Sequence, residues 1–121
     1  MAVGMLGEYL LGNAAELGKV VEVVVADHCK RLKFDLEPAL EAQLFYWKDG
    51  GREVDIVVEL FQKPLPVEVK YRDRIDKGDL RGLEEFSRRF GCSLGMVVTK
   101  DRLDVDGSVV MVPLWLFLLM C

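Results

Sequence analysis

Apolar and polar residues alternate along two adjoining stretches in the middle of the chain. Residues 52–60 read Arg-Glu-Val-Asp-Ile-Val-Val-Glu-Leu, and residues 65–71 read Leu-Pro-Val-Glu-Val-Lys-Tyr. A period of two is typical of β-strands that bury one face. The run Gln62-Lys63-Pro64 between them predicts a turn, so the two stretches should form neighbouring antiparallel strands.

The same alternation predicts which side chains share a face. Asp55 should lie on one face with Glu53 and Val57, and Glu68 should share a face with Lys70. The opposite face of the first strand should carry Val54, Ile56, Val58 and Leu60. Burial of that apolar face would fix the strand register, so two carboxylates and a lysine are expected to converge.

A long helix is predicted before these strands. Asn13 is a candidate N-cap with Glu16 at the capping-box position, and the helix should run to about Arg31 or Leu32. Residues 20–25 are rich in valine, which favours strands, but the charged residues gather on one side at a helical period; these are Glu16, Lys19, Asp27, Lys30 and Arg31. A shorter helix is expected ahead of it, at residues 5–12.

Glu22 lies off the charged side of this helix. Its neighbours one turn away are small or apolar, namely Gly18, Val25, Ala26 and Cys29. Its carboxylate is therefore expected to point into the structure or into a cleft, where a charge needs a partner.

The remaining segments predict an α/β fold with a mixed central sheet flanked by helices. Residues 43–48 should form the first strand, turned by Asp49-Gly50-Gly51 into the strand that bears Asp55. A helix at 77–90, with a buried stripe of Leu80, Leu83, Phe86 and Phe90, should cross over to a parallel strand at 93–99. A turn at 104–107, a strand at 109–112 and a closing segment at 113–120, as a short helix or an extended cap, would complete a single domain spanning 1–121.

Composition narrows the classes of function. The net charge of −4 argues against a protein that coats nucleic acid electrostatically, without excluding a nuclease with an acidic metal site. Three cysteines without metal-ligand spacing are expected to be reduced thiols, and one histidine makes a zinc site unexpected. The apolar run 109–121 is too short to cross a bilayer, so a cytoplasmic protein without a membrane partner is expected.

Asp55, followed by the Glu-x-Lys of Glu68 and Lys70, resembles the PD-(D/E)xK nuclease core of type II restriction enzymes and archaeal Holliday-junction resolvases. The resemblance implies a restriction-endonuclease-like α-β-β-β-α-β core that hydrolyses DNA, including branched or junction DNA. It also implies Mg²⁺ or Mn²⁺ bound by Asp55 and Glu68, with the Val69 carbonyl as a third ligand and Glu22 as a further catalytic acid or ligand from the preceding helix. Lys70 would orient or activate the attacking water.

Across its length the chain is also similar to the C-terminal domain of archaeal and bacterial AAA-type ATPases. The matching segments are 9–12, 17–22, 46–55, 67–70, 80–86, 97–99 and 112–117. No Gly-x-x-x-x-Gly-Lys-Ser/Thr loop is present, so the chain cannot itself be the ATPase, and a separate ATPase partner is one expectation. The apolar tail at 113–120 makes a homodimer a second expectation, and related resolvases are dimers.

Four basic residues near the second helix suggest a phosphate-binding ridge for DNA: Arg74, Lys77, Arg81 and Arg88. A solvated helix face interleaved with Glu84 and Glu85 is an equally good interpretation. Three functions therefore stay open: a Mg²⁺-dependent endonuclease, a catalytically inactive DNA-binding or assembly module, and a structural role in which Glu22, Asp55, Glu68 and Lys70 form a buried ion network. For Glu22 alone, the structural alternative is an ion pair with an arginine such as Arg52 or Arg72. His28, Trp47 and Trp115 are expected to serve packing.

Overall fold

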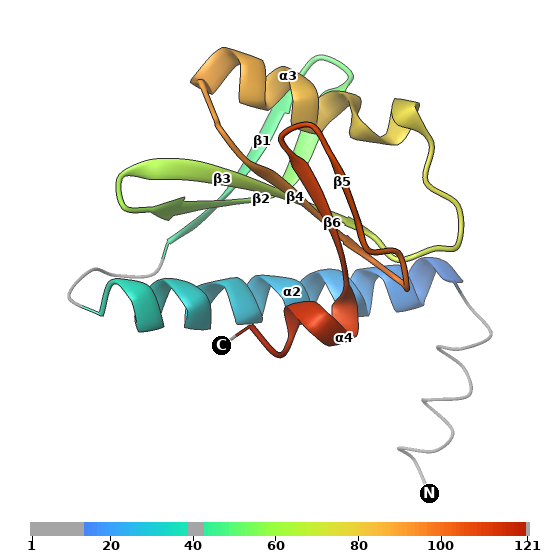
Figure 1. The fold of residues 1–121 in the computed structure, drawn as a ribbon, viewed down its shortest axis with the longest axis horizontal. Helices are drawn as coiled ribbons and strands as arrows, with labels where there is room; N and C mark the ends of the chain where they lie inside the picture. The colour runs from blue at the N-terminus through green and yellow to red at the C-terminus, as the bar shows by residue number, and fades with distance from the viewer. Residues whose placement is uncertain (1–13, 39–42, 121) are drawn as a thin grey trace, which may run out of the picture.

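A computed structural model describes residues 14–38 and 43–120 of the chain. The described residues form a mixed six-stranded sheet in the order β1-β2-β3-β4-β6-β5, with helices on both faces (Figure 1). The predicted helix at 5–12, the N-cap Asn13 and Cys121 lie outside the described residues.

The elements follow the predicted order of helix, three strands, helix and further strands. The strands are β1 (Leu44–Asp49), β2 (Arg52–Leu60), β3 (Lys63–Lys70), β4 (Gly95–Thr99), β5 (Asp104–Asp106) and β6 (Val109–Pro113). The helices are α2 (Ala14–Leu36), the 3₁₀ helix η1 (Lys77–Leu80), α3 (Arg81–Phe90) and α4 (Leu114–Phe117). The antiparallel pairing of β1, β2 and β3 and the parallel pairing of β3 with β4 confirm those predictions.

One face of the sheet is covered by α2 and α4, and the other by η1 and α3 (Figure 1). Val21, Val25 and Cys29 recur at a helical spacing on α2 and pack against Val58 and Phe117 in the largest apolar cluster. Full burial of each such side chain contributes about 1.5–3 kcal/mol, so this stripe overrides the strand propensity of the valines. The predicted helix is confirmed on this basis.

α2 continues one turn beyond its predicted end and stops at Leu36. Lys33 is buried, and its ammonium lies 2.8 Å from Glu37 Oε1. The same oxygen accepts the N–H of Phe61 at 2.6 Å. This contact with the β2–β3 hairpin gives the last turn of α2 a tertiary anchor that local sequence does not reveal.

α3 is shorter than predicted because its first turn is the 3₁₀ helix η1. The Asp76 N–H donates to Asp79 Oδ2 at 2.9 Å, which stabilises the start of η1. Leu80, Leu83 and Phe86 are buried as predicted, but Phe90 is half exposed beside the rings of Phe86 and Trp47. The stripe therefore ends one turn early, at the rim of the sheet.

A close approach between α3 and β2 requires Gly82. A Cβ on Gly82 would lie 2.1 Å from the backbone oxygen of Glu53. Only glycine lets the helix backbone pass so near the strand. The contact fixes the distance between α3 and the part of β2 that carries Asp55.

Three local predictions are wrong. The β2–β3 turn is Phe61–Gln62, both at positive φ, whereas Lys63 and Pro64 belong to β3, because two-residue turns of this type match the twist of paired strands. The predicted turn at 104–107 contains the short strand β5, which pairs with β6. Trp115 is largely exposed and does not serve core packing.

Candidate active site

A β-bulge in β2 sets the direction of Asp55. Phe45 pairs with Val57 and Trp47 pairs with Val54, so the single residue Tyr46 of β1 faces both Asp55 and Ile56. A bulge of this kind reverses the alternation of side chains along the strand. Bulges are common beside active sites, where they re-aim a side chain.

The bulge corrects the predicted faces of β2. Val54 and Val57 pack together with Phe86 beneath α3, whereas Ile56 and Val58 pack in the cluster beneath α2. Val54 thus does not share a face with Ile56, as strict alternation predicted. The sequence alone contains no clear signal for a bulge, because Asp55 and Ile56 fit a regular strand.

Asp55 and Glu68 join β2 to β3 where the backbone pairing ends. The last paired residues on this side are Ile56 and Val67. Beyond them the Asp55 N–H donates to Glu68 Oε1 at 2.9 Å, and the Val69 N–H donates to Asp55 Oδ2 at 3.0 Å. The two side chains replace the backbone hydrogen bonds of the hairpin.

Lys70 completes the cross-strand group. Its Nζ lies 3.5 Å from Glu68 Oε2, and its side chain is 25% exposed, so the ammonium reaches both the carboxylate and solvent. The predicted convergence of Asp55, Glu68 and Lys70 is therefore found.

Glu22 approaches the same group from α2. A cleft of about 360 Å³ is lined by Glu22 and Val23 on one side and by Asp55 and Ile56 on the other. Glu22 is exposed at this cleft and forms no ion pair with Arg52 or Arg72 among the described residues. The expectation of a carboxylate that faces a cleft holds, while the expected arginine partner is absent because Arg72 pairs with Asp79 at 2.8 Å.

The acids of this site have raised pKa values. Burial raises the pKa of Glu68 from its ordinary 4.5 to about 7, and the charge of Asp55 adds to the effect. Burial also raises the pKa of Asp55, against the opposing influence of the Val69 N–H and of Lys70. The pKa of Glu22 is raised by partial burial and then by Asp55 and Glu53. Lys70 alone thus does not balance the negative charges of Glu22, Asp55 and Glu68.

The donor set suits a hard divalent cation in its chemistry. Carboxylate oxygens are the ligands that Mg²⁺ prefers, and a cation would stabilise the charged forms of these acids, which burial and then neighbouring carboxylates disfavour. Within residues 14–38 and 43–120, however, no three His, Cys, Asp or Glu side chains already form a group that could hold a metal. Asp55 and Glu68 would supply two side-chain ligands, so the remaining positions would fall to the Val69 carbonyl, to Glu22 after a movement, or to water.

Sequence reasoning missed Tyr46 and Glu53. The Tyr46 hydroxyl donates to Glu53 Oε2 at 2.8 Å, and this bond, followed by burial and the charges of Glu53, Asp55 and Glu68, raises the pKa of Tyr46. Glu53 also raises the pKa of Glu22, so both residues belong to the electrostatic surroundings of the site. Only the bulge, which sets Tyr46 opposite Asp55, could have revealed them.

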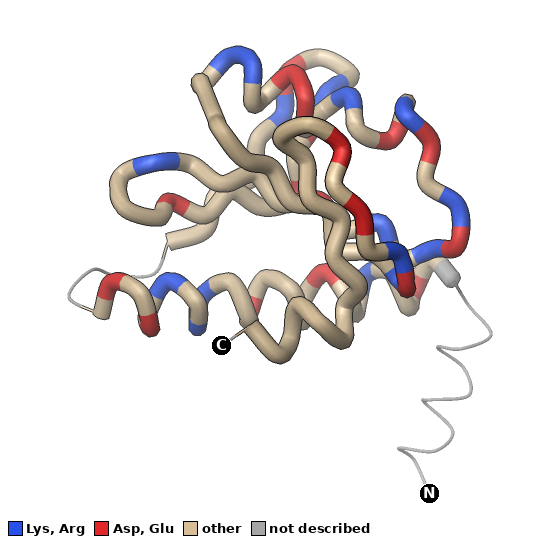
Figure 2. Tube along the Cα trace, viewed as in Figure 1, with Lys and Arg blue, Asp and Glu red and all other residues tan. Residues whose placement is uncertain are grey.

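Two of the predicted phosphate-binding residues, Arg81 and Arg88, lie on α3 away from the cleft, and acids accompany the basic residues. Figure 2 shows basic and acidic residues interleaved along η1 and α3. Arg74 pairs with Asp76, and Arg88 pairs with Glu85. Lys77 and Arg81 are exposed, but α3 covers the sheet face opposite α2, whereas the cleft opens beside α2. The solvated-face interpretation describes this ridge well.

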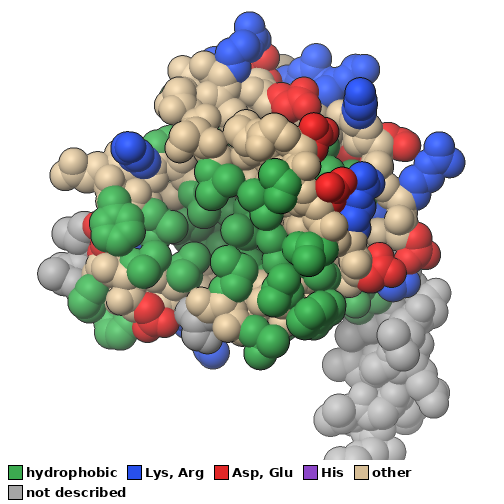
Figure 3. Space-filling view, in the orientation of Figure 1, with side chains coloured by type: hydrophobic (Ala, Val, Ile, Leu, Met, Phe, Trp, Pro, Cys, Tyr) green, Lys and Arg blue, Asp and Glu red, His purple; other side chains and the backbone are tan. Residues whose placement is uncertain are grey.

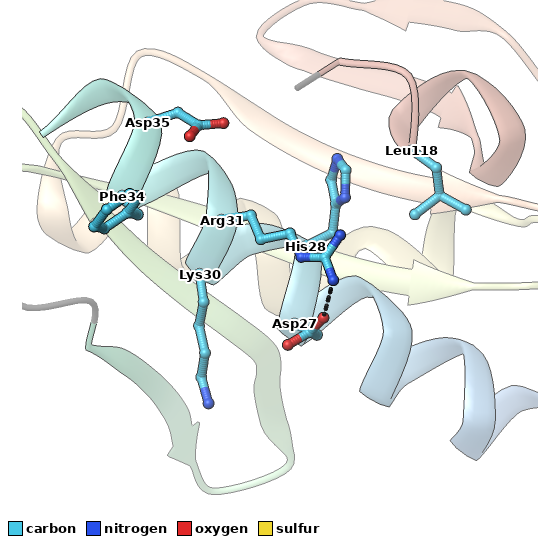
Figure 4. A pocket seen from close by; sticks show the side chains of 7 residues that line it. All are labelled: Asp27, His28, Lys30, Arg31, Phe34, Asp35 and Leu118. Atoms are coloured by element: carbon cyan, nitrogen blue, oxygen red, sulfur yellow. Dashed lines mark ion pairs between the residues drawn. The ribbon is translucent and has the colours of Figure 1, made fainter. Parts of the chain in front are cut away.

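A larger hollow, of about 620 Å³, lies away from Glu22, Asp55 and Glu68. It is lined by Asp27, His28, Lys30, Arg31, Phe34, Asp35 and Leu118 (Figure 4). His28 is buried at its floor, with its ring 4.9 Å from that of Phe117, which confirms the packing role predicted for it. The hollow lacks the convergent carboxylates of the cleft, so size alone does not locate the chemistry.

Comparison with known proteins identifies a family without assigning an activity. Residues 17–117 match DUF4143, a domain of unknown function. No curated protein and no solved structure matches the chain. Within the described residues, no helix combines the length and apolarity needed to cross a membrane. The match covers most of the sequence, and the chain therefore belongs to the DUF4143 family, a domain found in proteins associated with AAA-type ATPases.

Proposed function

We propose that this domain is a metal-dependent nuclease of the PD-(D/E)xK type, which hydrolyses phosphodiester bonds in DNA. The observation that carries the proposal is the bulge in β2, which turns Asp55 toward Glu22 while Glu68 and Lys70 stand directly across on β3. Acids from one helix and two strands, with one lysine, are the residue types that this chemistry requires. The order α2, β1, β2, β3, α3, β4 is the one expected for a restriction-endonuclease-like core.

The residues have distinct roles in this proposal. Asp55 and Glu68 would hold a Mg²⁺ or Mn²⁺ ion together with the Val69 carbonyl, and Glu22 would contribute from the helix side. When bound, the ion would polarise the scissile phosphate and lower the pKa of a water molecule. Lys70, held 3.5 Å from Glu68, orients the attacking water and offsets charge on the phosphate. Because the cleft at Glu22 and Asp55 is open and Lys70 is partly exposed, a phosphate of DNA could approach these three residues from solvent.

The test is calorimetric titration of Mn²⁺ and Mg²⁺ into the wild type and Asp55→Asn. Asparagine keeps an oxygen that can accept the Val69 N–H, so the fold should survive. We expect binding near one ion per chain in the wild type and none in the variant. The exposed acid Asp106 lies on the short edge strand β5, so Asp106→Asn is the matched control and should bind as the wild type does.

Cleavage of branched and linear DNA is measured on the same preparations. We expect metal-dependent cleavage that falls at least about 100-fold in Asp55→Asn. Lys70→Met should lose cleavage while it still binds the ion, because the lysine acts on the water and not as a ligand. A folded wild type that binds no divalent ion would refute the nuclease.

A second candidate is a catalytically inactive DNA-binding or assembly module on the same fold. It is favoured by the hydrogen bonds that already occupy Asp55 Oδ2 and Glu68 Oε1, and by the lack of a three-residue metal group among the described residues. In this case Asp55→Asn would leave DNA or partner binding unchanged and would not lower stability at neutral pH, because burial raises the pKa of Asp55. DNA binding that is independent of divalent ions, with no cleavage, would identify this function.

A further inference from the structure

The solvent-facing, charged side of α2 carries three exposed valines near its middle. Val23 is 69% exposed, and Val20 and Val24 beside it are exposed as well. On the inner face of the same helix, Val21 and Val25 are buried against the sheet. Exposed valines within a charged helix face are candidates for burial against a partner surface.

Charged residues flank Val23 in an order that pairs opposite charges when the row is set against a reversed copy of itself. Lys19 and Asp27 lie four residues before and after Val23, and Glu16 and Lys30 lie seven residues before and after it. Positions four and seven residues apart share one face of a helix, so these side chains form a single row with Val23 at its centre. The row reads acid, base, valine, acid, base.

We propose that α2 pairs antiparallel with α2 of a second copy of this chain, with Val23 at the two-fold axis. In this arrangement Lys19 of each copy faces Asp27 of the other, and Glu16 faces Lys30. Each contact then joins opposite charges, whereas a parallel pairing would set each charge against its like. A two-fold interface buries the same surface of both copies, so a self-complementary row is what it requires.

α4 adds apolar area beside this row. Its Phe117 packs on His28 of α2, and Trp115 and Leu119 are 61% and 73% exposed. Figure 3 shows hydrophobic side chains gathered across the centre of this view of the molecule. The hollow between Arg31, Phe34 and Leu118 adjoins the outer face of α2, so it can receive side chains of the second copy (Figure 4). Larger exposed apolar patches of this kind mark interaction surfaces.

The pairing borders the candidate active site, because Lys19 and Val23 also line the cleft beside Glu22 and Asp55. Glu22 directly precedes Val23 and therefore projects about 100° away around the helix, toward Asp55. Association tests the dimer and divalent-ion binding tests the cleft, so a failure of one proposal is distinguishable from a failure of the other.

The test is sedimentation equilibrium of the full chain over a roughly hundredfold range of concentration, where a dimer shows mass action. Val23→Glu would place two carboxylates at the axis and should weaken association at least about tenfold. Val105→Glu is the matched control, since Val105 is a valine of 67% exposure on β5 at the far edge of the sheet. The control should associate as the wild type does, and both variants should keep the wild-type circular dichroism.

A charge exchange tests the register. Lys19→Glu and Asp27→Lys should each weaken the dimer, because each sets like charges opposite one another. The double variant should restore association to within about threefold of the wild type. Lys19 and Asp27 of one chain are about 12 Å apart along the helix, so only contacts between copies can produce this rescue. A monomeric wild type, a Val23→Glu variant that still dimerises, or a double variant no better than the single ones would overturn the proposal.

Discussion

The β2–β3 hairpin is held by a glutamate at each end, and the two carboxylates are in opposite electrostatic states. At the turn, Glu37 accepts the Phe61 N–H and pairs with the buried Lys33, and these contacts lower its pKa. At the open end, Glu68 accepts the Asp55 N–H with Lys70 nearby, yet burial beside Asp55 raises its pKa to about 7. Both residues hold a backbone N–H and pair with a lysine, but Glu68 also has the carboxylate of Asp55 beside it, and its burial outweighs the lysine.

The difference separates a structural ion pair from a candidate site. A buried pair that lowers the pKa of its acid is complete as it stands and needs no ligand. A group of acids that raise one another's pKa stores unfavourable electrostatic energy in the folded state, which a bound cation would release. The raised pKa values of Asp55 and Glu68, set against the lowered pKa of Glu37, therefore support a ligand at Asp55 and Glu68 more strongly than the Asp and Glu-x-Lys motif does.

The largest expected effect on stability comes from a substitution at Gly82, which lets α3 approach β2 near the open end of the hairpin. Gly82→Ala places a Cβ against the Glu53 carbonyl, so α3 must move away from β2. We expect a loss of about 3 kcal/mol in the free energy of unfolding, measured by urea denaturation. Gly78→Ala, where a Cβ meets nothing within 4 Å, is the control and should change stability by less than about 0.5 kcal/mol. Equal losses in the two variants would mean that the close approach is not what matters.

Glu68→Gln tests the difference between the two glutamates through the pH dependence of the free energy of unfolding. Because the pKa of Glu68 is raised from 4.5 to about 7, the folded state holds this proton more tightly than the unfolded chain. Its contribution to stability is complete below pH 4.5 and is lost as pH rises through about 7. Glutamine keeps the oxygen that accepts the Asp55 N–H and removes the charge. Without metal, the variant should gain up to about 3 kcal/mol relative to the wild type above pH 7.

Glu37→Gln is the matched comparison at the other end of the hairpin, and its effect has the opposite sign. The lowered pKa of Glu37 stabilises the fold at neutral pH, and this contribution disappears as pH falls through the folded pKa. The variant should therefore be less stable than the wild type at pH 7 and approach it in acid, as followed by urea denaturation across pH. The same pH profile for both variants would remove the distinction between the two ends.

The smallest effect is expected at the turn. Gln62 has a φ of 66°, a conformation that glycine adopts without a Cβ penalty. Gln62→Gly should raise the free energy of unfolding by about 0.5–1 kcal/mol and leave the acids untouched. Gly50→Ala, at a φ of 61° in the β1–β2 turn, should lose a similar amount. A change in divalent-ion binding by Gln62→Gly would show that the two ends of the hairpin are coupled.

Local sequence determined most of the secondary structure of this protein. The stripe of Val21, Val25 and Cys29 specifies α2, and the alternation in residues 65–70 specifies β3, because helices and strands bury faces of different period. Glu68 and Lys70 could be placed on one face of β3 for the same reason, whereas strict alternation predicted Asp55 on the face of Val57 and the bulge sets its direction. The parallel crossover into β4 required only the length and pattern of the intervening helix.

Tertiary structure decided the features that depend on residues distant in sequence. The last turn of α2 depends on Lys33, Glu37 and Phe61 meeting across the hairpin, and Gly82 matters because the Glu53 carbonyl lies against it. The bulge that sets Tyr46 opposite Asp55 follows from how β1 pairs, and no periodicity in β2 encodes it. Tertiary structure also decides the charge state of the acids, because a pKa depends on burial and on neighbouring charges that only the folded chain brings together.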